Sequence, residues 1–280
     1  MKVIADSSST RTQWALIDDN NQQPVESALT AGLNPYFQTR REISHSIRLE
    51  LPPSFFRRRW GPVYFYGAGC ANPEKIKIME QSLTAQFKTR VFVESNLLAA
   101  ARGLLGDEPG MACILGTGSN SCLYDGEQIV QNVRPLGYIL GDEGSGAFLG
   151  KRFVADCLKE IAPAPLREAF YERHQLTVDE IMDGVYTNSL PNKTLSQYSF
   201  FLAEALDNEY VIQLIYDSFM QFFVRNIASY RYNGDNLCFV GSIATTFEPI
   251  LHRVARDFGM TIRKVVPSTL PGLINYHSTH

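Results

Sequence analysis

The sequence has no stretch of about 18 uninterrupted apolar residues, the length that a membrane-spanning helix needs. An excess of charge of one sign is also missing, since 26 Lys and Arg stand against 29 Asp and Glu for a net charge of −3. So weak a field argues against nucleic acid or an anionic membrane as the main partner. Hydrophobic residues make up 45% and charged residues 20%, which argues against disordered and fibrous architectures.

Cysteine is scarce, with five residues in 280, and no two of them have Cys-x-x-Cys spacing. Cys113, Cys122 and Cys238 lie in apolar strand-like runs, so we expect small core residues rather than a disulfide or metal framework. Five scattered histidines offer no metal cluster or catalytic dyad, and we expect His277 to lie in a frayed C-terminus. The first apolar run ends at Asp6 after three residues, too short for a secretory leader, so we expect a cytoplasmic protein.

Short apolar runs alternate with longer amphipathic segments, a pattern typical of α/β folds. The expected strands cover residues 3–5, 13–17, 25–29, 63–66, 91–93, 111–115, 121–124, 128–133, 237–240 and 261–265. The expected helices cover residues 36–51, 74–87, 96–105, 144–161, 246–258 and 270–276, with further helices and a helix-spaced aromatic core over 166–232.

Two segments suggest an internal duplication. Residues 3–18 (VIADSSSTRTQWALID) and 113–126 (CILGTGSNSCLYDG) each form an apolar strand, a turn of small residues and a second strand. A repeat at this spacing indicates two lobes rather than a solenoid. We expect an N-terminal lobe over 1–110, with the C-terminal helix 268–280 as a candidate addition, and a C-terminal lobe over 111–267 that carries a helical insertion.

The turns of these two hairpins are candidate phosphate sites. Small residues let a phosphate approach a concave group of backbone N–H donors, and the hydroxyls of Ser7, Ser8, Ser9, Thr10 and Thr12 would add further donors. Asp6, at the end of the first strand, is a candidate for holding Mg²⁺ through water. The alternative is that both segments are plain hairpin turns.

Two other nucleotide motifs are absent. The segment 116–121 (GTGSNS) is followed by a strand-like run and not by a helix, and its sixth residue is Ser121, so we reject a dinucleotide fingerprint. The Gly-x4-Gly-Lys-Ser/Thr pattern of P-loop proteins does not occur.

Two glycine-containing turns are further candidates for ligand contact. In 136–150 (LGYILGDEGSGAFLG) five glycines surround Asp142 and Glu143, and a carboxylate beside so many glycines is suited to holding hydroxyl groups. We interpret Asp142 as facing a ligand and Glu143 as an ordinary residue of a helix start. In 239–247 (FVGSIATTF), Gly241 and Ser242 leave room for a flat ring such as adenine, although such a turn is also a common strand-to-helix connection.

Taken together, these motifs resemble those of the BadF/BadG/BcrA/BcrD ATPase family, and within it those of the N-acetylglucosamine kinases. This group belongs with the sugar kinases, actin and the heat-shock ATPases. The resemblance covers the whole length, and its most specific part is GTGSN followed at the right distance by GYILGDEGSG. It implies an α/β, two-lobed ribonuclease-H-like (actin-like ATPase) fold, with a mixed sheet and helices in each lobe and a ligand cleft between the lobes.

The resemblance also implies roles for individual residues. The β- and γ-phosphates and the metal would face Asp6 and the turn Ser7, Ser8, Ser9, Thr10, Arg11 and Thr12. A second phosphate loop would comprise Gly116, Thr117, Gly118 and Ser119. Sugar hydroxyls would contact Asn34, Asn120 and Asp142, and the adenosine would lie beside Gly241 and Ser242.

The chain departs from the family pattern at positions that bear on catalysis. Ser8 stands where glycine is usual, so a positive φ there would cost about 1 kcal/mol. Arg11 replaces lysine, and Gln13 stands where aspartate is frequent. Asn96 occupies the place of the aspartate that takes the proton from the sugar hydroxyl in relatives, and an amide cannot accept that proton. Glu94 would share a face with Asn96 if the strand continued through residue 96, and is the alternative base.

The sequence therefore predicts an ATP- and Mg²⁺-dependent amino-sugar kinase acting on N-acetylglucosamine or a related sugar. A catalytically impaired nucleotide- or sugar-binding sensor is the alternative, because of Asn96. An ATPase activator of radical dehydratases is disfavoured, because the five cysteines supply no pair at a glycine-rich turn. We expect a small-molecule sugar as partner, with no nucleic acid and no membrane, and a homodimer remains open.

Overall fold

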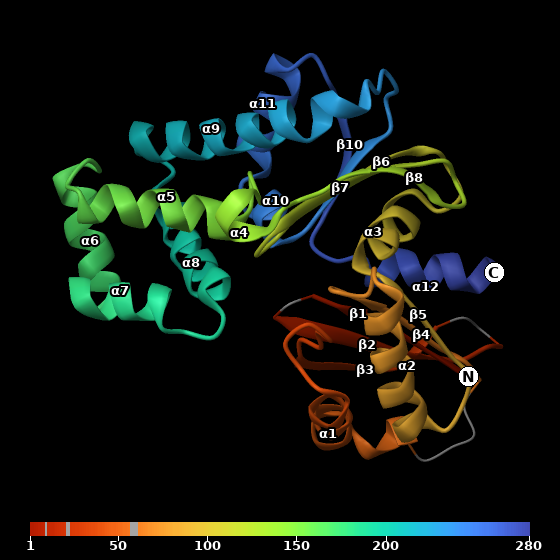
Figure 1. The fold of residues 1–280 in the computed structure, drawn as a ribbon. Helices are drawn as coiled ribbons and strands as arrows, with labels where there is room; N and C mark the ends of the chain where they lie inside the picture. The colour runs from red at the N-terminus through yellow and green to blue at the C-terminus, as the bar shows by residue number, and fades with distance from the viewer. Residues whose placement is uncertain (9, 21–22, 57–60) are drawn as a thin grey trace. The chain divides into compact units, whose positions relative to one another are not determined.

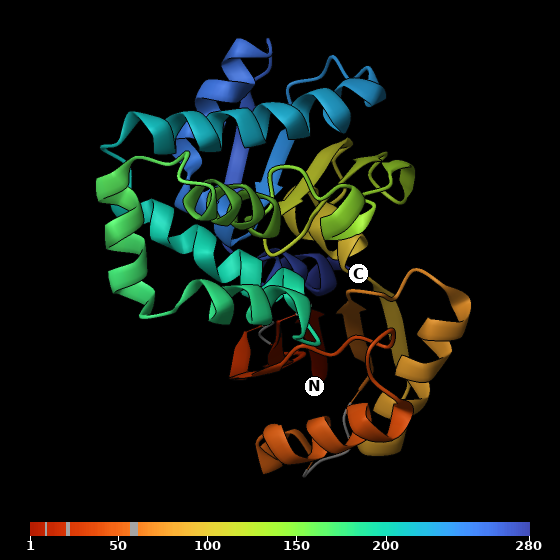
Figure 2. The same ribbon diagram turned by 60° about the vertical axis from the view of Figure 1, so that its left-hand side comes forward.

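The computed structural model describes residues 1–8, 10–20, 23–56 and 61–280 of the chain. These residues form two compact units (Figures 1 and 2). Unit 1 comprises Met1–Pro109, Tyr124–Ile129 and Ser268–His280. Unit 2 comprises Gly110–Leu123 and Val130–Pro267.

Unit 1 is built on a five-stranded sheet of order β3-β2-β1-β4-β5 (Figure 1). Its strands are β1 (Lys2–Ser7), β2 (Arg11–Ile17), β3 (Pro24–Ala31), β4 (Val63–Gly67) and β5 (Val91–Ser95). Its helices are α1 (Arg40–Glu50), the 3₁₀ turn η1 (Pro53–Phe56), α2 (Pro73–Phe87), α3 (Asn96–Leu105) and α12 (Leu270–Thr279). The sheet is mixed, because β1 pairs antiparallel with β2 and parallel with β4.

The two faces of this sheet are covered by different helices. Val3 and Ala5 belong to a core with side chains of α1 and α2. Ile4, one position along, packs with Ala99 of α3 and Leu273 of α12. This alternation follows from the two-residue period of a strand, so Asp6 shares the face of α3 and α12.

Helices α3 and α12 approach closely where each carries a glycine. A side-chain carbon built on Gly272 would lie 1.8 Å from the carbonyl oxygen of Gly103. A side-chain carbon on Gly103 would in turn lie 2.8 Å from the carbonyl oxygen of Thr269. The backbones therefore touch here, at a separation that no larger residue allows.

The C-terminus is ordered, so the expected fraying at His277 is wrong. Helix α12 continues to Thr279, and His277 is buried. The Tyr66 hydroxyl and His277 Nε2 lie 2.8 Å apart, and Lys2 Nζ donates to the His277 carbonyl oxygen. Burial lowers the pKa of His277 to about 3, so the ring is neutral at physiological pH.

Unit 2 is built on a second five-stranded sheet, of order β10-β9-β6-β7-β8 (Figure 1). Its strands are β6 (Gly110–Leu115), β7 (Ser119–Tyr124), β8 (Ile129–Val133), β9 (Leu237–Val240) and β10 (Ile262–Val266). Read from β8, the strands occupy the same positions as those of unit 1 read from β3. The predicted α/β class and the internal duplication are confirmed.

A long helical segment separates β8 from β9. Its elements are α4 (Gly137–Leu140), α5 (Gly146–Leu158), α6 (Ala164–His174), α7 (Val178–Tyr186), α8 (Pro191–Ser199), η2 (Phe200–Ala205), α9 (Glu209–Arg225) and η3 (Ile227–Tyr230). The helix expected over 144–161 is shorter, because Ser145 caps α5. The helix expected over 246–258 is α11 (Glu248–Asp257), and a short helix that was not expected, α10 (Ser242–Thr246), precedes it.

The core of unit 2 is aromatic. Phe153 and Phe170 contact edge to face, and Phe222, Phe223 and Phe239 form a second group. The helical spacing predicted Phe222 and Phe223 as core residues, and both are buried. All five cysteines are free and buried, which confirms the prediction for the three in strand-like runs. No helix in the described part of the chain combines the length and apolar character needed to cross a membrane.

Replacement of Gly272 by alanine tests the contact between α3 and α12. Alanine gains about 1 kcal/mol of helix propensity. Its methyl group meets the Gly103 carbonyl, and overpacking of this kind costs about 3 kcal/mol. We expect Gly272→Ala to lower the free energy of unfolding by about 2 kcal/mol, measured by urea denaturation.

Gly184→Ala in α7 is the control, because a side-chain carbon there lies 3.5 Å from Thr194, an ordinary contact. This control should be neutral or gain up to about 1 kcal/mol. Equal stability of Gly272→Ala and Gly184→Ala would contradict the close contact.

Candidate functional site

The turn between β1 and β2 is closed by a serine hydroxyl. Ser8 Oγ accepts the N–H groups of Thr10 at 3.3 Å and Arg11 at 3.2 Å, and the Ser8 N–H donates to the Arg11 carbonyl at 2.9 Å. Ser8 is not among the described residues with a positive φ, so the condition under which serine would be strained here is not met. Ser9, also predicted to contact phosphate, lies outside the described residues.

The hydroxyls of Ser7 and Thr12 are engaged inside unit 1. They lie 2.7 Å apart, and both side chains are buried. Ser7 Oγ accepts the Leu33 N–H at 3.0 Å, and Thr12 Oγ1 donates to the Ala31 carbonyl at 3.0 Å. They fix the segment after β3 to the hairpin, and a direct contact with phosphate remains a prediction.

The fixed segment carries Asn34. Its Oδ1 accepts the Tyr36 N–H at 3.0 Å, and its own N–H donates to Gln38 Oε1 at 2.8 Å. Gly69, with φ +80°, passes so close that a side-chain carbon there would lie 2.5 Å from Asn34 Oδ1. Oδ1 accepts one backbone N–H here, and the amide nitrogen Nδ2 is the donor that Asn34 has for a ligand.

Asp6 lies at the end of β1 on the α12 face, with Gln13 of β2 and Tyr66 of β4 beside it. The Thr269 hydroxyl donates to Asp6 Oδ2, and the Ser268 hydroxyl donates to Gln13 Oε1. Burial raises the pKa of Asp6 to about 6, and the Thr269 hydrogen bond and the Arg11 charge oppose that rise.

The sequence analysis missed Ser268 and Thr269. A Ser-Thr pair two residues before Pro271 signals a helix start, but nothing in the sequence links it to Asp6, more than 260 residues away.

The donor set at Asp6 suits magnesium and not a metal held by several side chains. The described residues contain no group of three or more His, Cys, Asp or Glu side chains that could hold a metal ion. Mg²⁺ usually binds through one or two carboxylates and keeps waters and substrate phosphate oxygens as its other ligands. A single partly buried carboxylate, two residues before Ser8, fits that coordination.

The two predicted catalytic residues do not share a strand face. Strand β5 ends at Ser95, whose Oγ accepts the Leu98 N–H at 3.2 Å and caps α3. Asn96 is therefore the first residue of a helix, and the expectation that it lies on one strand face with Glu94 is wrong. Glu94 is exposed and lies beside Tyr66 across β4 and β5.

In unit 2 the loop Gly116–Ser119 lies over the start of α5. The Gly146 N–H donates to the Gly116 carbonyl at 2.8 Å, and the Ala147 N–H donates to the Thr117 carbonyl at 3.1 Å. In a trans peptide the N–H points opposite to the carbonyl, and the described residues contain no cis bond. The N–H groups of Thr117 and Gly118 therefore point away from α5, as a phosphate loop requires.

Asp142 lies against the same loop. Its Oδ1 accepts the Ser119 N–H at 3.3 Å, and a side-chain carbon on Gly118 would lie 3.0 Å from its Oδ2. Its backbone has φ 54°, a conformation in which aspartate and asparagine are enriched. Burial raises the pKa of Asp142 to about 6, Glu143 adds to the rise, and the Ser119 N–H and Lys151 oppose it.

The interpretation of Glu143 as an ordinary residue of a helix start is wrong. Ser145 caps α5 through the Phe148 N–H at 3.1 Å, while Glu143 Oε1 lies 3.4 Å from Arg225 Nη1 of α9. Glu143 is buried, so this ion pair fixes the glycine-rich turn to α9.

The other candidates of unit 2 border the loop. On β7, Asn120 Oδ1 accepts the Ser121 N–H and the Asn132 Nδ2–H, both at 2.9 Å, which leaves its own Nδ2 for a ligand. Gly241 has φ 127°, and a side-chain carbon there would lie 2.3 Å from the Leu115 carbonyl oxygen. Gly241 and Ser242 thus begin α10 directly against the start of the loop.

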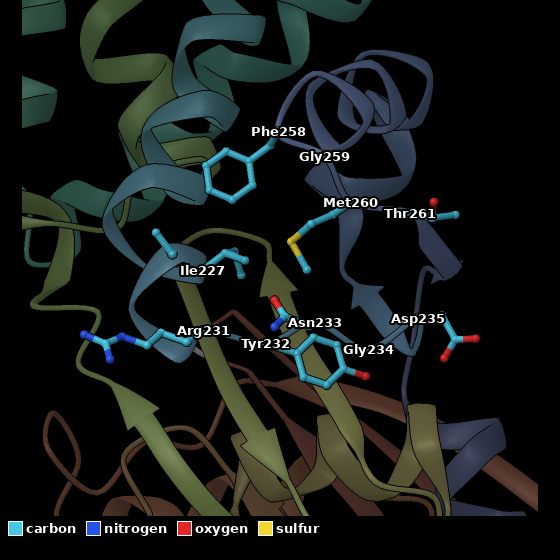
Figure 3. A pocket seen from close by; sticks show the side chains of 11 residues that line it. Ile227, Arg231, Tyr232, Asn233, Gly234, Asp235, Phe258, Gly259, Met260 and Thr261 are labelled. Carbon is cyan, nitrogen blue, oxygen red and sulfur yellow. The ribbon is translucent and has the colours of Figure 1, made fainter.

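A cavity of about 540 Å³ elsewhere in unit 2 contains none of these candidates (Figure 3). Residues of η3, of the chain up to β9 and of the turn before β10 line it, among them Ile227, Tyr232 and Met260. The predicted residues of unit 2 instead gather around the loop Gly116–Ser119.

Comparisons with known proteins found similar chains among solved structures. No protein-family model matches the chain, and no curated protein matches its sequence. A solved structure from Porphyromonas gingivalis, provisionally assigned as an N-acetylglucosamine kinase, shares 42% identity and a TM-score of 0.96, with 100% of this chain and 99% of that one covered.

Two more distant structures share the fold. One, from Chromobacterium violaceum, carries the same provisional assignment, with 17% identity, a TM-score of 0.73 and 98% of both chains covered. The other is a ROK family glucokinase from Streptomyces griseus in complex with glucose and AMPPNP, with 13% identity and a TM-score of 0.61. It covers 98% of this chain and 97% of that one.

The raised pKa of Asp142 makes its charge a cost to stability. Because the folded-state pKa of about 6 exceeds the ordinary 3.8, stability falls as the pH rises from about 4 to about 6 and stays lower above that range. We expect Asp142→Asn, which tolerates the same φ, to be more stable than the natural protein at pH 7.5 by about 2 kcal/mol. The difference should shrink at pH 5, measured by urea denaturation.

Asp125→Asn is the matched control. Hydrogen bonds from the backbone N–H groups of Gln128 and Glu127 lower the pKa of Asp125. Its substitution should therefore destabilise the protein at pH 7.5 and have less effect as the pH falls through that lowered pKa. If both substitutions change the free energy of unfolding in the same direction, burial of the carboxylate does not explain the effect of Asp142→Asn.

Proposed function

The chain belongs to the N-acetylglucosamine kinase group of the BadF/BadG/BcrA/BcrD ATPase family, and from that premise we propose that it phosphorylates an amino sugar. The γ-phosphoryl group of ATP would pass to a hydroxyl of N-acetylglucosamine or a related sugar. The observation that carries the proposal is the full-length match at 42% identity. The buried Asp142 beside the Gly116–Ser119 loop supports it from the geometry.

ATP would bind through backbone donors. The N–H groups of Thr117 and Gly118 point away from α5 and would meet phosphate oxygens, and the Gly241–Ser242 turn beside the loop would border the adenosine. At the first hairpin, phosphate would compete with the Ser8 hydroxyl for the N–H groups of Thr10 and Arg11.

Asp6 would hold Mg²⁺, directly or through water, and the metal would neutralise charge on the phosphate oxygens. Asp6 is the only acidic side chain assigned to it, so most ligands would be water and phosphate.

The sugar would meet donors and an acceptor in fixed directions. Asn34 and Asn120 each use Oδ1 within the protein and would present Nδ2 to sugar oxygens. Asp142 has a pKa of about 6, so it is ionised at neutral pH and would accept hydrogen bonds from sugar hydroxyls. Such charge-assisted bonds would repay the cost of burying the carboxylate.

Asn96 would make the proposed phosphoryl transfer slow. An amide accepts no proton, and a missing general base typically reduces the rate about 10²–10⁴-fold. Phosphoryl transfer depends mainly on positioning and charge stabilisation, so slow turnover is compatible with Asn96. The same residue supports the second candidate, a nucleotide- or sugar-binding sensor with no useful turnover.

Asn96→Asp separates these candidates. Because residue 96 is the first of α3, an aspartate there is favoured by the helix dipole and should fold normally. We expect kcat with N-acetylglucosamine and ATP to rise at least about 10-fold, measured by a coupled assay of ADP release. Asn72→Asp is the control. It also places an aspartate at a helix start, as the N-cap of α2, and should leave kcat unchanged.

Each outcome bears on one candidate. A substituted protein that binds ATP and sugar yet stays inert would refute the impaired kinase. Natural protein that turns over at about 1–100 s⁻¹, the ordinary range for kinases, would refute the sensor.

A further inference from the structure

We propose that Thr269, at the start of the last helix, is the positioning residue for Asp6, and that it sets the affinity of the site for a metal–nucleotide complex. The inference rests on the proposed function, because it assigns the carboxylate of Asp6 to that metal. Thr269 itself need not touch metal, nucleotide or sugar.

The contact is direct, and the protein shields it. The Thr269 hydroxyl donates to Asp6 Oδ2, and Thr269 is 4% exposed. The neighbouring Ser268 hydroxyl donates to Gln13 Oε1. Asp6 and Gln13 are cross-strand partners on β1 and β2, so the two hydroxyls bridge both strands just below the first phosphate turn.

The helix that carries Thr269 is itself held at several points. Gly272 touches the Gly103 carbonyl of α3, and the Thr269 backbone lies against Gly103. Further along α12, His277 bonds to Tyr66, and its carbonyl accepts from Lys2. One group of contacts lies at the start of α12 and the other near its end. The helix therefore cannot slide along the sheet without breaking contacts at both places.

The two oxygens of the Asp6 carboxylate would have different roles. Oδ2 receives the Thr269 hydroxyl, and Oδ1 has its own lone pairs for a metal ion or a metal-bound water. Groups that orient a metal ligand through a hydrogen bond typically account for about 10–100-fold in metal affinity. Without the hydroxyl, the carboxylate can rotate and lose its fixed direction toward the hairpin.

Binding of Mn²⁺ in place of Mg²⁺ tests the proposal without catalysis. The dissociation constant of Mn²⁺ with a non-hydrolysable ATP analogue is measured by electron paramagnetic resonance for three variants. Thr269→Val removes the hydroxyl at constant volume, and we expect affinity to fall about 10-fold or more. Thr269→Ser keeps the hydroxyl and should stay within about 3-fold of the natural protein.

Ser278→Ala is the control on the same helix. Its hydroxyl donates only to the Asn275 carbonyl, and it should leave Mn²⁺ binding unchanged. In turnover assays, Thr269→Val should raise the Mg²⁺ concentration for half-maximal rate while the KM for sugar changes less than about 3-fold. A general structural defect would change both.

Two results overturn the proposal. One is folded Thr269→Val, checked by its melting temperature, that binds Mn²⁺ and analogue as tightly as the natural protein. Should the valine variant fail to fold, Thr269→Cys replaces it, because a thiol is a weaker donor. The second result that overturns the proposal is a Thr269→Cys variant with the same Mn²⁺ affinity as the natural protein.

The proposed function is tested separately. If the natural protein phosphorylates no amino sugar while Thr269→Val still weakens Mn²⁺–nucleotide binding, the kinase proposal fails and the role of Thr269 stands.

Discussion

Unit 1 depends on the close packing of the last helix of the chain against its first strand. Gly103 and Gly272 have no side chains, so the backbones of α3 and α12 touch, and α12 lies along the face of β1 that carries Asp6. A larger residue at either position would push α3 and α12 apart. The hydroxyls of Ser268 and Thr269 would then lose contact with Gln13 and Asp6.

Both predicted ligand-binding carboxylates are held in an unfavourable state. Burial raises the pKa of Asp6 and of Asp142 to about 6. A charge in such a place weakens the free protein. In the proposed function, a cation beside Asp6 and sugar hydroxyl groups beside Asp142 would compensate that cost. The surrounding packing supplies the stability that the two groups cost, from the largely aromatic core of unit 2 and from hydrophobic layers on both faces of the first sheet.

In unit 2 the candidate phosphate loop presents backbone groups, and neighbouring side chains hold that backbone in place. The start of α5 receives the carbonyls of the Gly116–Ser119 loop, which turns the opposite N–H groups outward. Asp142 adopts a left-handed conformation to reach the Ser119 N–H, and Gly241 adopts one to lie against Leu115. Glu143, paired with Arg225, secures the same turn to α9. Aspartate and asparagine are enriched at the φ of Asp142, and the backbone of Gly241, with φ 127°, is one that side chains rarely adopt.

The sequence by itself determined the α/β class, the duplicated strand–turn–strand units and the aromatic core, because these depend on the local period of apolar residues and on glycine-rich turns. It also selected Asp142 and the GTGS turn as candidates, since glycines beside a carboxylate are unusual in a plain helix start, and the structure brings the two together. Only the tertiary structure decided the partners of these residues. Thr269 meets Asp6 and Arg225 meets Glu143 across long separations in the chain, and hydrogen bonds and ion pairs of this kind leave no periodic signal. The end of β5 at Ser95, which separates Glu94 from Asn96, was likewise set by a helix cap that competes with strand pairing over a single residue.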